Sequence, residues 1–257
     1  MPSKEQLDLA LARYPAALAL RAAASKSSTD IVALDRWYRG ELRTAVHDRI
    51  ERDDEPEQRL TLDELKRVMD WKLARGKFRP RLQAMIASNP PSTLASALSR
   101  HSSATSPRAR LEALCTLKAV GPATASALLA LFKPAQEPFM SDEAMEFVNS
   151  RSAGAGGGAG GKKEYTVKAW EAYRADMLQR KDDERWESVE ELEMALWSWG
   201  VLCKYGGEEE KEGLLGDVKK GAQEDAPRRS KKRSSKTVAA LEDTPSLPTA
   251  TKKRKSR

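Results

Sequence analysis

The feature that most constrains the fold of this chain is the spacing of its apolar residues. They recur at helical intervals in almost every segment of the body, while runs that alternate apolar and polar residues are scarce. Ile31, Leu34, Tyr38, Leu42 and Val46 form one such stripe. This period is typical of α-helices that bury one face. The sequence therefore predicts an all-α, multi-helix domain.

Changes in composition divide the chain into four parts. Residues 1–150 are predicted to form a helical domain, followed by a flexible glycine-rich insertion, RSAGAGGGAGGKK, at residues 151–163. Helices of the same domain are expected to resume over residues 164–205. Residues 206–257 are rich in charge and poor in large apolar side chains, so we expect a disordered basic tail there.

Cysteine usage and hydropathy narrow the class of protein. The two cysteines, Cys115 and Cys203, lie far apart inside apolar helical patterns, which indicates neither a disulfide framework nor a metal site. We therefore expect a reduced, intracellular protein without metal or cofactor. No apolar run approaches the ~20 residues of a membrane-spanning helix, and the N-terminus resembles neither a signal nor a transit peptide, so no membrane partner is expected.

Positive charge is concentrated in two places, of which the C-terminal tail is the first. The formal net charge is +7, but residues 226–257 carry eleven Lys or Arg against two acidic residues, which leaves residues 1–225 at −2. Short clusters of this kind resemble nuclear import signals and can also touch nucleic acid, although a merely solubilising tail is the alternative. We expect a nuclear protein whose import machinery binds Arg228, Arg229, Lys231, Lys232, Arg233, Lys252, Lys253, Arg254 and Lys255.

The second concentration of positive charge is a basic block at residues 71–110, which contain eight Lys or Arg and no Asp or Glu. The block can form an electrostatic footprint for a polyanion, or it can be a set of solvated helix faces whose acidic partners come from elsewhere in the fold. Like charges repel one another unless an anion or an acidic neighbour relieves them. The residues from which we expect phosphate contacts are Lys72, Arg75, Lys77, Arg79 and Arg81.

A glycine-centred turn lies between two helical patterns within residues 108–132. Pro122 follows the turn, at the start of a helix, where no backbone donor is required. The first N–H groups of a helix have no partner inside it and carry partial positive charge, so a phosphate fits there. The expected donors are the backbone N–H groups of Gly121, Ala123 and Thr124.

The segment LKAVGPATASALL, residues 117–129, resembles a helix-hairpin-helix motif, usually written L-x-G-V-G-x-x-T-A, which binds the DNA backbone without reading sequence. Ala119 stands where the motif has its first glycine. The resemblance extends to the endonuclease III-type superfamily of DNA glycosylases, in which a catalytic Asp follows the hairpin by about twenty residues at a helix N-terminus. Asp142 lies 21 positions after Gly121. The resemblance implies that Asp142 stabilises charge on the sugar or activates water while the target base is flipped out.

The same resemblance limits the chemistry. Members that also cleave the backbone carry a lysine just before the Thr-Ala of the hairpin, whereas this chain has Ala123, so a lyase step is not expected. The iron-sulfur cluster of some members needs four cysteines, and only Cys203 lies beyond the hairpin. A flipped base would need a stacking surface, for which the aromatic residues before the hairpin are Trp37, Tyr38, Trp71 and Phe78.

Other interpretations of these residues stay open. Ser141 is a good N-cap and an Asp favours the first turn of any exposed helix, so Asp142 can be purely structural. The segments at residues 60–89, 138–144 and 195–202, together with the hairpin, also resemble a group of eukaryotic proteins for which no reaction is established. Three functions remain: a DNA-binding protein that contacts the sugar-phosphate backbone without sequence specificity, a DNA N-glycosylase without lyase activity, and a non-catalytic helical protein-interaction module.

Overall fold

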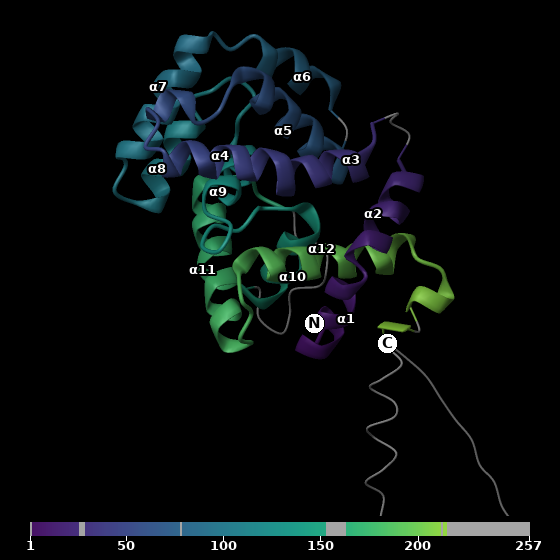
Figure 1. The fold of residues 1–257 in the computed structure, drawn as a ribbon. Helices are drawn as coiled ribbons and strands as arrows, with labels where there is room; N and C mark the ends of the chain where they lie inside the picture. The colour runs from purple at the N-terminus through teal and green to yellow at the C-terminus, as the bar shows by residue number, and fades with distance from the viewer. Residues whose placement is uncertain (1, 26–28, 78, 153–162, 212, 215–257) are drawn as a thin grey trace, which may run out of the picture.

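The computed structural model describes residues 2–25, 29–77, 79–152, 163–211 and 213–214. Within these residues every regular element is a helix and no strand occurs, which confirms the all-α class (Figure 1). The labelled elements are α1 (Lys4–Ala12), α2 (Tyr14–Ala23), α3 (Ile31–Arg36), η1 (Trp37–Leu42), α4 (Arg43–Glu51), η2 (Pro56–Gln58), α5 (Leu62–Arg75), α6 (Pro80–Ala87), α7 (Pro91–Ser103), α8 (Pro107–Leu114), α9 (Pro122–Phe132), α10 (Asp142–Ser152), α11 (Val167–Asp183) and α12 (Val189–Tyr205).

Helices α3, η1 and α4 follow one another without a break and form a rod across the molecule (Figure 1). Its middle segment, η1, is π-helical, a form that occurs mostly as short insertions in α-helices. The predicted apolar stripe lies on the buried side of this rod. Its five members are all in the core: Ile31, Leu34, Tyr38, Leu42 and Val46.

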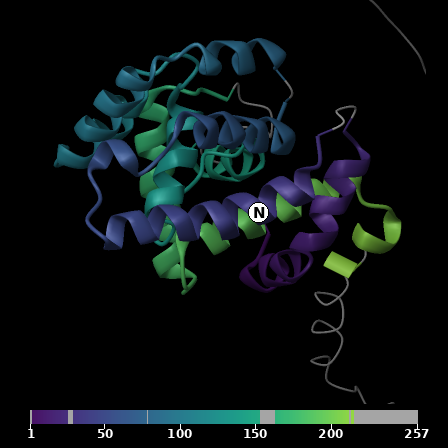
Figure 2. The same cartoon turned by 45° about the horizontal axis from the view of Figure 1, so that its top comes forward.

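The helices pack in two groups. Helix α12 packs against α1, α2 and α10. In the other group α5 packs against α6 and α9, and α8 packs against α7 and α9, while α11 touches α8 and α9 as well as α10 and α12. Figure 2 shows the blue helices of the second group on one side and the purple α1 and α2 on the other. Gly200 permits the close approach of α12 to α10, because a Cβ there would lie 2.9 Å from Glu143 Cβ.

The folded part extends past residue 205, where the tail was predicted to begin. Residues 208–211 are helical, and the Arg13 guanidinium donates to the Glu210 carbonyl at 3.3 Å. Leu214 is only 1% exposed. The predicted boundary at residue 206 is therefore wrong. Leu214, in a polar stretch, is buried in the apolar core, and composition alone does not reveal this contact.

The glycine-rich insertion also begins later than predicted, because α10 runs to Ser152. The rest of the insertion at residues 153–162 lies outside the described residues, as do residues 215–257 with all the Lys and Arg of the expected import signals.

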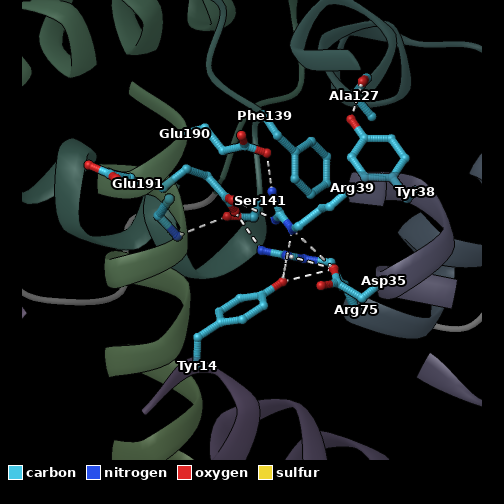
Figure 3. Close-up of polar contacts among 12 residues, drawn as sticks. Tyr14, Asp35, Tyr38, Arg39, Arg75, Ala127, Phe139, Ser141, Glu190 and Glu191 are labelled. Atoms are coloured by element: carbon cyan, nitrogen blue, oxygen red, sulfur yellow. Dashed lines mark hydrogen bonds and ion pairs between the residues drawn. The ribbon is translucent and has the colours of Figure 1, made fainter. Parts of the chain in front are cut away.

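A buried ionic network joins the rod to α5 and α12 (Figure 3). Arg75 is 1% exposed, and its guanidinium donates to Glu193 at 2.7 Å and to the Tyr14 hydroxyl at 2.7 Å. It also lies 3.6 Å from Asp35, whose second cationic neighbour is Arg39 at 3.3 Å. Burial alone would raise the pKa of Asp35, but the two arginines, together with hydrogen bonds from Trp71 and Tyr14, outweigh it and lower that pKa. The network therefore holds Asp35 ionised inside the protein.

Candidate nucleic-acid interface

A cleft opens where α5 ends and where α6, α9 and α10 begin. Its inner cavity, about 380 Å³ in volume, is lined by residues 119–124 and by Lys72, Asp142 and Tyr165, among others. A second cavity of about 990 Å³ shares part of its wall, including Asp142 and Tyr165, and continues toward α12. We call the joint space the α9–α10 cleft. Members of the basic block, the glycine turn and the candidate carboxylate, which belong to different segments of the sequence, therefore meet in one cleft.

The turn between α8 and α9 closes although Ala119 replaces the first glycine of the motif that it resembles. Ala119 adopts φ 65°, in the left-handed region that a glycine adopts more readily. Lys118, the residue before Ala119, is held by the side-chain amide of Asn89. The Lys118 N–H donates to the Asn89 side-chain oxygen at 2.8 Å, and the Asn89 side-chain nitrogen donates to the Lys118 carbonyl at 3.1 Å. Sequence reasoning missed Asn89, because its partner lies 29 residues away.

We expect Ala119→Gly to raise the free energy of unfolding by about 0.5–1 kcal/mol. Glycine removes the left-handed strain of roughly 1–2 kcal/mol from the folded state, but it also raises the entropy of the unfolded chain, which cancels part of that stabilisation. Urea unfolding measures the difference. Ala95→Gly, inside α7, is the matched control and should destabilise by roughly 1 kcal/mol. Equal destabilisation by both substitutions would contradict a strained turn.

Two of the three predicted backbone donors are free. The Gly121 and Ala123 N–H groups have no acceptor among the described residues, and a Cβ at Gly121 would meet nothing within 4 Å. The Thr124 N–H instead donates to the Gly121 carbonyl at 2.9 Å. The prediction for Thr124 is therefore wrong, because the first turn of α9 tightens and satisfies that group internally.

The five predicted cations separate into three kinds. Lys72, Lys77 and Arg79 line the cleft and have no carboxylate within 4 Å among the described residues. Arg75 reaches the cleft wall, but its guanidinium is committed to the buried network, so the expectation that it binds phosphate is not supported by its position. Arg81 is exposed on α6 and does not line either cavity.

Asp142 is the first residue of α10 and also faces the cleft. The hydroxyl of Tyr165 donates to its carboxylate at 2.5 Å, and burial together with this hydrogen bond raises the pKa of that hydroxyl. Ser141 accepts the Ala144 N–H at 3.4 Å, so its predicted role as an N-cap also has support. The structural and the functional interpretations of Asp142 are thus compatible. Sequence gave no signal for Tyr165, which lies beyond the glycine-rich segment.

The aromatic residues considered for stacking lie elsewhere. Trp37, Tyr38 and Trp71 are buried, and Tyr38 stacks on Trp71 with 3.7 Å between ring centroids. Phe78 lies outside the described residues. The described aromatic side chains that line the cleft beside the turn are Phe139 and Tyr165.

Comparison with protein-family models, curated proteins and solved structures finds no significant match. Across the described ranges, no helix is long and apolar enough to cross a membrane. Within the same ranges, no group of three or more His, Cys, Asp or Glu side chains is placed to hold a metal ion.

Proposed function

We propose that the α9–α10 cleft binds the sugar-phosphate backbone of DNA, and that α8, residues 115–121 and α9 act as a helix-hairpin-helix. The observation that carries this proposal is the convergence of three helix N-termini, those of α6, α9 and α10, on a cleft that Lys72, Lys77 and Arg79 also line. A helix start carries partial positive charge and attracts anions. Helices α6 and α9 begin without a side-chain cap, so their first N–H groups are not occupied by a capping side chain.

The proposed contacts do not read sequence. Backbone N–H groups, lysine and arginine meet phosphate oxygens, which are the same at every base pair. The C-terminal end of α5 also reaches the cleft, but Lys72 and Arg75 in its last turn offset its partial negative charge.

A nuclear location belongs to the same proposal and rests on the Lys/Arg clusters within residues 228–255.

Electrophoretic mobility of a duplex, titrated at several salt concentrations, tests the proposal. Three phosphate contacts by Lys72, Lys77 and Arg79 predict a slope of log affinity against log salt of about −2.7, and a scrambled duplex should bind equally well. The basic tail can bind DNA by itself, so the titration is repeated with the eleven Lys and Arg of residues 226–257 changed to Gln. Loss of all binding in this tail-neutralised protein would instead favour the protein-interaction function.

A second candidate function is a DNA N-glycosylase without lyase activity. The observation that favours it is the position of Asp142 in the cleft, with its carboxylate oriented by Tyr165. A carboxylate there can stabilise positive charge that develops on a deoxyribose as its base departs. Base release from damaged duplex by the wild type, lost in Asp142→Asn with duplex binding retained, would support catalysis. Equal release by both proteins would exclude Asp142 as the catalytic group.

A further inference from the structure

A separate cavity of about 260 Å³ lies beside α8, where α4, α7 and α9 end. The described residues that line it are different from those of the α9–α10 cleft, which lies at the other end of α9. No Asp or Glu is among them. Its walls include Arg59, Leu98, His101, Arg110, Phe132 and Lys133. We call this space the α7–α9 pocket.

The three cations of the α7–α9 pocket keep hydrogen-bond donors that the protein does not use. Arg59 and Arg110 each donate through Nε to a main-chain carbonyl, at 3.2 and 3.3 Å, and Arg59 also donates to the Ser102 hydroxyl at 3.2 Å. Within the described residues, the terminal nitrogens of Arg110 and the amine of Lys133 make no hydrogen bond. The closest carboxylate there is that of the exposed Asp53, 4.0 Å from Arg59. Two anchored guanidinium groups and one amine are therefore available to an anion.

The helix ends at the pocket account for only part of this positive charge. A helix C-terminus carries about half a negative elementary charge, so the ends of α4, α7 and α9 offset roughly 1.5 of the three positive charges. His101 adds no charge, because burial lowers its pKa to about 4 and the three cations lower it further, against a hydrogen bond with the Arg110 carbonyl. The remaining like charges repel one another, and a bound anion would relieve them.

We propose that the α7–α9 pocket binds the phosphate group of a small monophosphate ester, whose apolar or aromatic part lies against Leu98 and Phe132. A monoester phosphate carries about −1.5 to −2 charges at pH 7, which balances more of the pocket than the single charge of a diester. Arginine binds phosphate oxygens through paired N–H donors, and lysine adds a point charge.

The size of the pocket limits the ligand. Its volume of about 260 Å³ lies just below the ~300–1,000 Å³ of most ligand pockets, so a phosphate with one small substituent fits better than a large cofactor. The ring of Phe132 already packs against that of His101, with 5.0 Å between centroids. This site does not depend on DNA binding by the α9–α10 cleft.

Titration of the tail-neutralised protein with phenyl phosphate, followed by nuclear magnetic resonance of the histidine rings, tests the proposal. The chain has two histidines, so His47→Gln assigns the His101 signal. We expect saturable binding that raises the pKa of His101, because the ligand offsets the three cations around it. Inorganic phosphate should bind more weakly because it lacks the ring, and dimethyl phosphate, a diester, about tenfold more weakly or less.

Two substitutions within the pocket and one outside it make the test specific. Lys133→Gln and Arg110→Gln should each keep the helical circular dichroism and bind phenyl phosphate about tenfold more weakly, the usual effect of losing a hydrogen bond to a charged group. Arg108→Gln, also on α8, removes a cation that is paired with Glu112 and Glu171, and should bind as the wild type does.

Several results would overturn this inference. They are wild-type affinity in both Lys133→Gln and Arg110→Gln, a His101 signal that phenyl phosphate leaves unchanged, and equal binding of dimethyl phosphate, which would indicate a phosphodiester site. Loss of phenyl phosphate binding in Gly121→Glu, with binding kept in Lys133→Gln, would place the ligand in the α9–α10 cleft instead. Failure of the protein to bind duplex would contradict the proposed function and leave the α7–α9 pocket unaffected.

Discussion

Gly121→Glu should weaken duplex binding by about thirtyfold at low salt, which corresponds to ~2 kcal/mol, within the range of a like charge brought against a phosphate. Gly121 is the exposed N-cap of α9 and its own N–H is one of the two free donors. A side chain there meets no protein atom within 4 Å of its Cβ, so a carboxylate at this position extends into the α9–α10 cleft. Mobility shift of a duplex by the tail-neutralised protein measures the loss without interference from residues 226–257.

The matched control is Gly121→Ala, which adds a methyl group to the same open space without charge. It should fold as the wild type does and lose much less affinity than Gly121→Glu. Because neither substitution meets protein atoms at Cβ, both should keep the helical circular dichroism of the wild type. Wild-type affinity in Gly121→Glu would show that DNA does not pass the start of α9, and the proposed interface would be wrong.

Local features of this chain were predictable from sequence. The stripe from Ile31 to Val46 is a repeat within one segment, and burial of that face follows from the period alone. The turn at Gly121 and the helix start at Asp142 were each recognisable from the local sequence, but the cleft in which they meet was not. The free N–H groups at Gly121 and Ala123 follow from the geometry of any helix start.

Features that depend on distant partners were not predictable. Arg75 belongs to a basic block in sequence, but its carboxylate partner Glu193 lies 118 residues further along the chain. A count of charges within residues 71–110 does not include the acids that α12 brings to α5. The hydrogen bond from Tyr165 to Asp142 and the burial of Leu214 are of the same kind. Composition indicates how much charge a segment carries, whereas the fold determines which charges are paired.

Arg75→Ala should lower the free energy of unfolding by about 3–5 kcal/mol, the usual cost of removing one partner of a buried ion pair. The substitution leaves Glu193 without its 2.7 Å partner, removes one of the two cations near Asp35 and takes a donor from the Tyr14 hydroxyl. Those groups are deeply buried, so water does not replace the lost contacts without cost. Urea-induced unfolding, followed by circular dichroism, measures the difference.

Two further variants test whether the loss of stability comes from breaking the buried Arg75–Glu193 pair and not from removing a positive charge in general. Arg81→Ala, in the same basic block but exposed, should change stability by no more than about 0.5 kcal/mol. Arg75→Met combined with Glu193→Leu removes both charges and should recover a large part of the loss seen in Arg75→Ala, because no carboxylate is then stranded at that pair. If Arg75→Ala cost as little as Arg81→Ala, Arg75 would be free of the network and available to phosphate, as its place in the basic block first suggested.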